Sequence, residues 1–195
     1  MRVSILQLSP ETLHALADGD LARANETAPV PLPAVFVTPG WVGTWRFRSA
    51  QVREDPTVAD WITGAVWDTA DELVVGKAGF HAPPDPDGMV EVGYAVVPEL
   101  RRRGYARAAL EVLLERAARE PAVRVVRASV SPDNAASLAL IAQYRFVRVG
   151  EQWDDEDGLE IVYELRLDPS SCDGDAAARP RGTPSGADDL AGGKS

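Results

Sequence analysis

Between residues 90 and 119 the apolar residues change from the period of a strand to the period of a helix. Bulky and small side chains first alternate, which is the two-residue period of a strand. The bulky face consists of Val90, Val92, Tyr94 and Val96, and the opposite face is small except for Glu91. After Pro98, apolar residues recur with the spacing of an amphipathic helix, at Leu110, Leu113, Leu114 and Ala117. We therefore predict a strand, a short turn and a helix, around which the fold is organised.

The other apolar segments are shorter and mostly resemble strands. We predict strands near residues 3–8, 61–67, 73–80, 123–131, 146–149 and 159–165, and helices near residues 10–19 and 134–143. Ser9 and Pro10 suit the N-cap and the first position of the first helix. The strand near 123–131 follows the central helix closely enough to lie parallel to the central strand through a right-handed crossover. The pattern predicts an α+β fold with a mixed, mostly antiparallel sheet of about six or seven strands flanked by helices.

Composition narrows the classes of partner. The 195 residues carry 30 acidic and 20 basic side chains, a net charge of −10, so we expect no nucleic-acid partner and mildly favour a cationic acceptor. Cys172 is the only cysteine, which excludes a disulfide framework. No apolar stretch has the length of a membrane span or the form of a signal peptide, and we expect a cytoplasmic protein without a membrane partner.

The last part of the chain differs in composition from the rest. From Pro169 onward it consists mainly of Gly, Ser, Ala, Asp and Pro, and such a segment buries too little apolar surface to offset its ordering entropy. We expect one domain over residues 1–168 and a disordered tail over residues 169–195.

The junction between the central strand and helix has the composition of an anion site. It contains Arg101, Arg102, Arg103, Gly104, Tyr105 and Ala106. A turn with glycine at a helix start lets several backbone N–H groups point outward together, and the helix dipole adds partial positive charge there. A pyrophosphate suits such a cradle. A basic patch for nucleic acid or a solvated helix start is the alternative, but neither accounts for the small residues at 104 and 106.

The order of strand, Val96–Val97–Pro98, Arg101-x-x-Gly104-x-Ala106 and helix resembles the acetyl-CoA-binding motif of the GNAT superfamily of N-acetyltransferases. Residues 131–137, Ser-Pro-Asp-Asn-Ala-Ala-Ser, and Phe146 resemble the second cofactor-side segment of the branch that acetylates ribosomal-protein N-termini. The resemblance covers roughly residues 1–167. This chain has Arg145 where the family usually has glycine.

The resemblance implies roles for individual residues. The backbone of Arg102–Ala106 would hold the pyrophosphate, and the main chain of Val96 and Val97 would pair with the pantetheine arm and polarise the thioester carbonyl. Asn134 and Ser137 would contact the cofactor, although both also suit ordinary helix capping. Many members place a tyrosine as general acid where this chain has Ile141. The implied co-substrate is acetyl-CoA, with a small-molecule or peptide amine as acceptor, and a homodimer is left open.

Candidates for the general base and for the acceptor site have ordinary alternatives. Glu91 is the first candidate for the base, and a solvent-facing strand glutamate is the alternative. His81 and His14 are weaker candidates for the base, and the alternative for both is a plain surface histidine. Trp41 and Trp45 are candidates for an aromatic lid over the acceptor, with core packing as the alternative. Two functions remain open: an N-acetyltransferase, or a CoA-binding regulatory or structural module with an inactive acceptor site.

Overall fold

The sheet is mixed and is built from seven strands within the part of the chain that the computed structural model describes, residues 2–154 and 158–167. The strands are β1 Val3–Leu6, β2 Gly64–Asp68, β3 Leu73–Phe80, β4 Met89–Val96, β5 Val125–Val130, β6 Val147–Asp154 and β7 Gly158–Arg166. Their order in the sheet is β1-β2-β3-β4-β5-β7-β6. β4 and β5 pair in parallel, and the other neighbouring strands pair antiparallel. The predicted fold class is confirmed.

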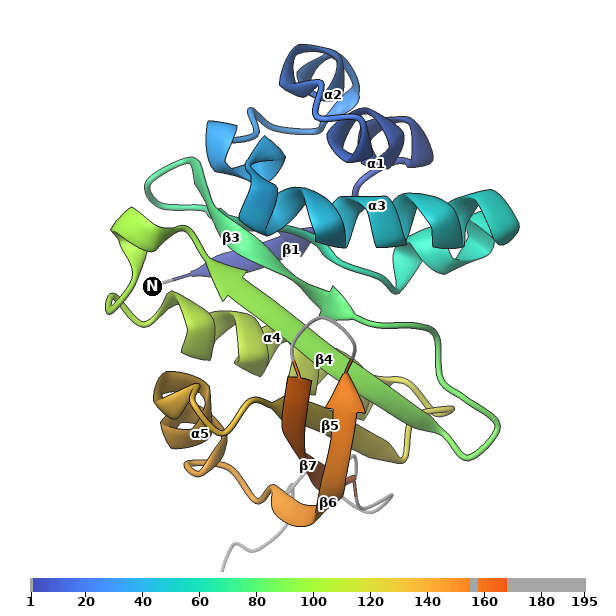
Figure 1. Cartoon of the computed structure of the whole chain (residues 1–195), viewed down its shortest axis with the longest axis vertical. Helices are drawn as coiled ribbons and strands as arrows, with labels where there is room; N and C mark the ends of the chain where they lie inside the picture. The colour runs from blue at the N-terminus through green and yellow to red at the C-terminus, as the bar shows by residue number, and fades with distance from the viewer. Residues whose placement is uncertain (1, 155–157, 168–195) are drawn as a thin grey trace, which may run out of the picture.

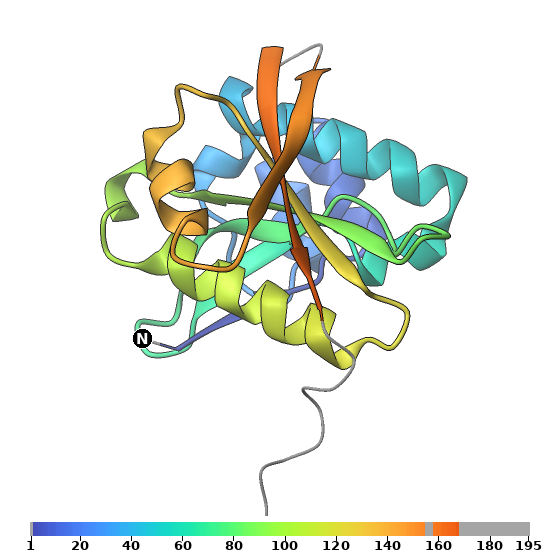
Figure 2. The same cartoon turned by 90° about the horizontal axis from the view of Figure 1, so that it is seen from below.

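Helices cover both faces of the sheet (Figures 1 and 2). One face carries the helices that precede β2, and the other carries the helices that precede and follow β5. The α-helices are α1 Pro10–Ala17, α2 Leu21–Thr27, α3 Pro39–Glu54, α4 Tyr105–Arg119 and α5 Ala135–Ile141. Short 3-10 turns are η1 Ala34–Val37, η2 Pro56–Asp60 and η3 Pro98–Leu100. Figure 2 shows α3 and α4 on opposite sides of the strands.

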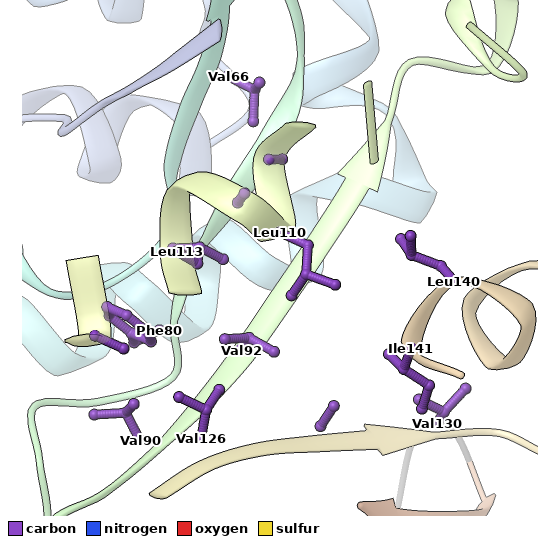
Figure 3. Close-up of a cluster of buried hydrophobic side chains, with 14 of the residues drawn as sticks. Val66, Phe80, Val90, Val92, Leu110, Leu113, Val126, Val130, Leu140 and Ile141 are labelled. Atoms are coloured by element: carbon purple, nitrogen blue, oxygen red, sulfur yellow. The ribbon is translucent and has the colours of Figure 1, made fainter. Parts of the chain in front are cut away.

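Each face has its own hydrophobic core. On the α4 and α5 side, Leu110 and Leu113 of α4 and Ile141 of α5 pack with Val92 of β4 and Val126 of β5 (Figure 3). This cluster confirms that the bulky face predicted for the central strand points inward. On the other side, the core joins the helices α1 to α3 to β2 and β3 and contains Phe36, Trp41 and Trp45.

Local signals predicted most of the elements well. Ser9 caps α1, because its Oγ accepts a hydrogen bond from the backbone N–H of Thr12 at 3.2 Å. The strand predicted at 146–149 is longer and runs from Val147 to Asp154. The tryptophans Trp41 and Trp45 belong to the 16-residue helix α3, which is absent from the predicted helices. The predicted tail, residues 169–195, lies outside the described residues.

The central feature of the sheet is a gap between β4 and β5. The two strands pair only where Met89, Val90 and Glu91 lie beside Val125, Val126 and Arg127. Beyond Glu91, β4 stays paired with β3 as far as Val96, opposite Gly76, while β5 continues along β7. The strands therefore diverge after Glu91, five residues before Val96.

Among the described residues, no helix has the length and apolar character that crossing a bilayer requires, and no three His, Cys, Asp or Glu side chains gather closely enough to hold a metal ion.

Candidate active site

Two cavities meet at the gap between β4 and β5. The first, of about 570 Å³, lies between the start of α4 and the start of α5. The second, of about 320 Å³, lies on the α3 side. Both are lined by Tyr94, Ala95, Asn134 and Ser137, so the two cavities share a wall along β4 and at the start of α5. Below they are called the α4 cavity and the α3 cavity.

The α4 cavity contains the predicted anion cradle. Arg102 and Gly104 both have left-handed backbone conformations, with φ of 63° and 87°, and such alternation turns successive N–H groups toward one side. No side chain caps the start of α4, so the first N–H groups of this 15-residue helix are open to an anion. Gly104 suits its position because residues with a β-carbon are strained at this φ.

Eight of the ten residues predicted to bind the cofactor line this cavity: Val96, Arg101, Arg102, Gly104, Tyr105, Ala106, Asn134 and Ser137. Arg103 and Val97 are absent from its lining. The Tyr105 side chain is buried, and its hydroxyl donates to Asp68 Oδ2 at 2.8 Å, so this residue anchors α4 to β2 and offers only its backbone to a ligand. Asn134 Oδ1 accepts from the Ser137 N–H at 3.1 Å, which is the helix-capping role that the sequence left open.

The backbone N–H groups of Val96 and Val97 point to opposite sides of β4, so the two residues cannot share the role predicted for them. Val97 donates its N–H to the Val75 carbonyl at 2.9 Å, and the Glu91 carbonyl accepts from the His81 N–H at 2.8 Å. Because backbone groups alternate in direction along an antiparallel strand, the residues from 91 to 97 with odd numbers face β3. The N–H groups of Tyr94 and Val96 therefore face the gap. Val97, whose N–H is used within the sheet and whose side chain is buried, is corrected from a cofactor contact to a structural residue.

Tyr94 stands at the junction of the two cavities, a position that the sequence analysis missed. Its hydroxyl interacts with the side chain of Ser137, and burial outweighs this contact and raises the pKa of the phenol above its ordinary value of 10.0. The group is therefore protonated at neutral pH and can donate a proton or a hydrogen bond. The position of the usual family tyrosine holds Ile141, which is buried. Tyr144 points elsewhere and donates to Glu111 at 2.9 Å.

His81 lines the α3 cavity and lies against β4 at Gly93. A β-carbon at Gly93 would lie 2.7 Å from His81 Nε2, so only glycine leaves room for the imidazole here. The backbone carbonyl of His81 accepts from Arg48 at 2.8 Å and from Gln51 at 2.9 Å, and α3 thereby fixes where the residue sits.

Glu91, the predicted base, lies behind His81 instead of lining the α3 cavity. Its Oε1 is 3.9 Å from His81 Nδ1. Burial is the largest influence on the imidazole and lowers its pKa below 6.5, Arg48 acts in the same direction, and Glu91 and Asp154 oppose them. The side chain is 46% exposed, which limits the burial effect. A neutral imidazole at pH 7 can accept a proton.

The α3 cavity is not acidic, although the net charge of the chain is −10. The fully charged side chains in its lining are Lys77 of β3 and Glu160 of β7. Lys77 is 9% exposed, and its Nζ donates to Thr44 Oγ1 of α3 at 2.5 Å. Glu160 accepts from Gln152 Nε2 at 2.9 Å. The cavity therefore presents a cation on one wall and a carboxylate on another.

Three further candidate residues have structural roles. Trp45 is fully buried and donates from Nε1 to the Phe36 carbonyl at 2.9 Å, and Trp41 stacks on Phe36. The lid interpretation of these tryptophans is wrong, and the core alternative holds. His14 Nδ1 lies 2.7 Å from Ser49 Oγ and joins α1 to α3.

Comparison with known proteins identifies the family to which this fold belongs. The model of the acetyltransferase (GNAT) domain matches residues 10–147. The chain therefore belongs to this family.

Individual relatives are distant. The uncharacterized N-acetyltransferase YjdG of Bacillus subtilis (strain 168) is 32% identical over 74 residues, which are 38% of this chain and 44% of YjdG. The chain thus aligns with less than half of that relative. The ribosomal-protein-S5-alanine acetyltransferase of Vibrio fischeri has a similar structure, with a TM-score of 0.55, 18% identity and coverage of 85% of this chain and 92% of the other. Salmonella typhimurium yncA, solved with its cofactor acetyl-CoA, gives a TM-score of 0.54, 19% identity and coverage of 87% and 99%.

Proposed function

We propose that the protein transfers an acetyl group from acetyl-CoA to a primary amine by direct attack. The observation that carries this proposal is the gap between β4 and β5, which brings an anion cradle at the start of α4 and a separate polar cavity to one shared wall. A pyrophosphate at the cradle and a thioester beside β4 would leave the α3 cavity for the acceptor. Family membership supports acetyl-CoA as the co-substrate.

The residues around the gap suit the steps of the transfer. His81, neutral at neutral pH, takes a proton from the attacking ammonium in the α3 cavity, directly or through water. The amine then attacks the thioester carbonyl, and the Val96 N–H that faces the gap stabilises the oxyanion, a contribution of typically ~3 kcal/mol for one such donor. In the tetrahedral intermediate the C–N bond has formed; as the carbonyl double bond returns, the C–S bond breaks. Tyr94 gives a proton to the departing thiolate and regains one from the second proton of the amine, directly or through water, while the proton taken by His81 passes to water.

This assignment changes the predicted base. Glu91 acts on His81 by its charge, 3.9 Å from Nδ1, and His81 meets the acceptor. The proposal keeps the rest of the sequence-based interpretation, namely one domain over residues 1–168 and a motif at residues 131–137 similar to that of the ribosomal-protein N-terminal acetylating branch.

A free-thiol assay with acetyl-CoA and a panel of amines tests the proposal. We expect CoA to appear only when an amine is present. The second candidate function is a CoA-binding module, favoured by the absence of a tyrosine at Ile141. Acetyl-CoA that raises the melting temperature of the protein, without thiol release across the panel, would favour that function over catalysis.

A further inference from the structure

Lys77 is a buried cation on the wall of the α3 cavity. Besides its hydrogen bond to Thr44, its Nζ lies 4.7 Å and 5.5 Å from the ring centroids of Trp41 and Trp45. The ion pairs found within residues 2–154 and 158–167 do not include Lys77. The other charged group that acts on it is Arg48, which carries the same sign. Within the described residues, no carboxylate balances this lysine.

A buried charge without a counterion is unfavourable for folding, and a neutral side chain of similar shape would fill the same space at lower cost. The choice of residue is also selective. The sequence contains two lysines, Lys77 and Lys194, against eighteen arginines. A lysine is a compact point charge that suits one carboxylate, whereas an arginine presents a broad fork. These features indicate that the missing counterion belongs to a ligand.

Other residues of the cavity lining have the complementary character. Glu160 of β7 and the neutral imidazole of His81 line the cavity together with Ser129, whose Oγ accepts from Gln152 Nε2 at 3.2 Å. Lys77 lies opposite Ala95 in the β3–β4 pairing, and Gly93, beneath His81, lies two residues back along β4. Two residues of strand span about 7 Å. At about 320 Å³, the cavity suits a small molecule with unlike charges at its two ends.

We propose that the acceptor of this enzyme is a small amino acid-like molecule whose carboxylate pairs with Lys77 and Thr44 while its amine lies toward His81 and Glu160. This inference rests on the proposed acetyl transfer for the role of the amine, but the carboxylate site exists with or without turnover. It replaces the expectation of a purely cationic acceptor.

The site is tested first without catalysis. Protein labelled with ¹³C at the lysine ε-carbon contains two labelled residues, and the signal that disappears in Lys77→Met belongs to Lys77. In the free protein we expect this signal to titrate with a pKa of about 8. The probes are glycine, 3-aminopropanoate, 4-aminobutanoate, 5-aminopentanoate and 6-aminohexanoate, each beside its amide. At least one acid should raise the pKa of Lys77 by roughly one unit or more, and its amide should not.

Two results of this titration overturn the inference. A pKa at or above 10.5 in the free protein would mean that a carboxylate of this chain already balances Lys77. A pKa that none of the five acids changes would mean that the cavity does not bind the carboxylate.

Kinetics then test the consequence for the acceptor. With thiol release as the assay, kcat/KM for the best acid should exceed that for its amide roughly tenfold or more. Lys77→Met should bring this ratio to within about twofold of one. Arg53→Met, which removes one exposed positive charge at the far end of α3, should leave the ratio as in the wild type. Equal use of acids and amides by the wild type, or a ratio unchanged in Lys77→Met, would refute the inference. Thiol release with no amine at all would contradict the proposed acetyl transfer instead, and the titration would still decide the carboxylate site.

Discussion

Replacing Lys77 by methionine should make the protein more stable at neutral pH. Burial lowers the pKa of this lysine from 10.5 to about 8, with a smaller contribution from Arg48, and 9% of the residue is exposed. Because the folded pKa is depressed, the unfolded chain binds the proton more tightly than the folded chain does. The charge therefore destabilises the folded state by the full amount below about pH 8 and by a decreasing amount up to pH 10.5.

The size of the effect follows from the two pKa values. Their difference of 2.5, at about 1.36 kcal/mol per pKa unit, corresponds to roughly 3 kcal/mol. Methionine also loses the cation–π contacts with Trp41 and Trp45 and the hydrogen bond to Thr44, which together offset on the order of 1 kcal/mol. A net gain of about 2 kcal/mol in the free energy of unfolding should raise the melting temperature by roughly 4–8 °C in a domain of this size.

The pH dependence separates this explanation from simple repacking. Between pH 8 and 10.5 the unfolded wild type still binds the proton that the folded wild type has lost, so wild-type stability rises with pH through this window. The advantage of Lys77→Met should shrink over the same window and vanish above it. Urea unfolding of the variant and of the control Arg53→Met at pH 7, 9 and 10.5 measures this. A variant less stable than the wild type at pH 7, or a difference independent of pH, would show that the lysine is not an unbalanced buried charge.

Four further predictions concern the cofactor, the chemistry and the tail. Gly104→Asp should abolish the rise in melting temperature that acetyl-CoA gives, and Gly104→Asn should keep part of it. Both residues tolerate a left-handed backbone, but only aspartate repels phosphate. Equal behaviour of the two variants would argue against a phosphate at this turn. His81→Gln should lower kcat and remove the acid limb of the pH profile, which has an apparent pKa below 6.5 in the wild type. Glu91→Gln should move that limb to still lower pH, because it removes a charge that raises the pKa of His81. A large loss of kcat at all pH values in Glu91→Gln would restore Glu91 as the base. Tyr94→Phe should lower kcat, by about 10²-fold or more if Tyr94 is the general acid, with a smaller loss for acyl donors whose thiol is more acidic than CoA; an unchanged kcat would leave the thiolate to depart unassisted. Deletion of residues 169–195 should leave the unfolding free energy and the acetyl-CoA affinity as in the full chain, and a large loss of stability would contradict the predicted tail.

The turn and the helix start that line the α4 cavity could be predicted from the sequence because they are built from consecutive residues. The change of period at Pro98 and the small residues at 104 and 106 determine the strand, the turn and the helix start locally, and the anion cradle follows from backbone geometry alone. The parallel pairing of β4 and β5 was predictable for the same reason, since the helix between them is short and its crossover has one favoured hand.

The α3 cavity could not be predicted in this way, because contacts between distant segments form it. In the sequence, Lys77 resembles an ordinary solvent-facing residue of a strand. It is buried only because α3 packs over that face of β3. Tyr94 belongs to the bulky, inward face of β4 and resembles a core residue until the gap beside it is known. Signals existed for two of the missed features. Gly93 within a strand marked a close approach, which is that of His81, and α3 repeats Trp41, Trp45 and Val52 on one face, with the polar Arg48 interrupting an otherwise helical period.

Charge shows most directly why overall composition is a poor guide to this site. The net charge of −10 describes the surface that partners meet at a distance, where it bears on encounter rates and solubility. The electrostatic potential in the α3 cavity depends instead on the few charged groups that are buried near it. Lys77 and Arg48 are buried cations on the side of the sheet that α3 covers. The folded protein retains a charge that destabilises it by roughly 3 kcal/mol. Such a cost is typical of sites built for a ligand, because the group that weakens the empty fold is the one that a bound carboxylate stabilises.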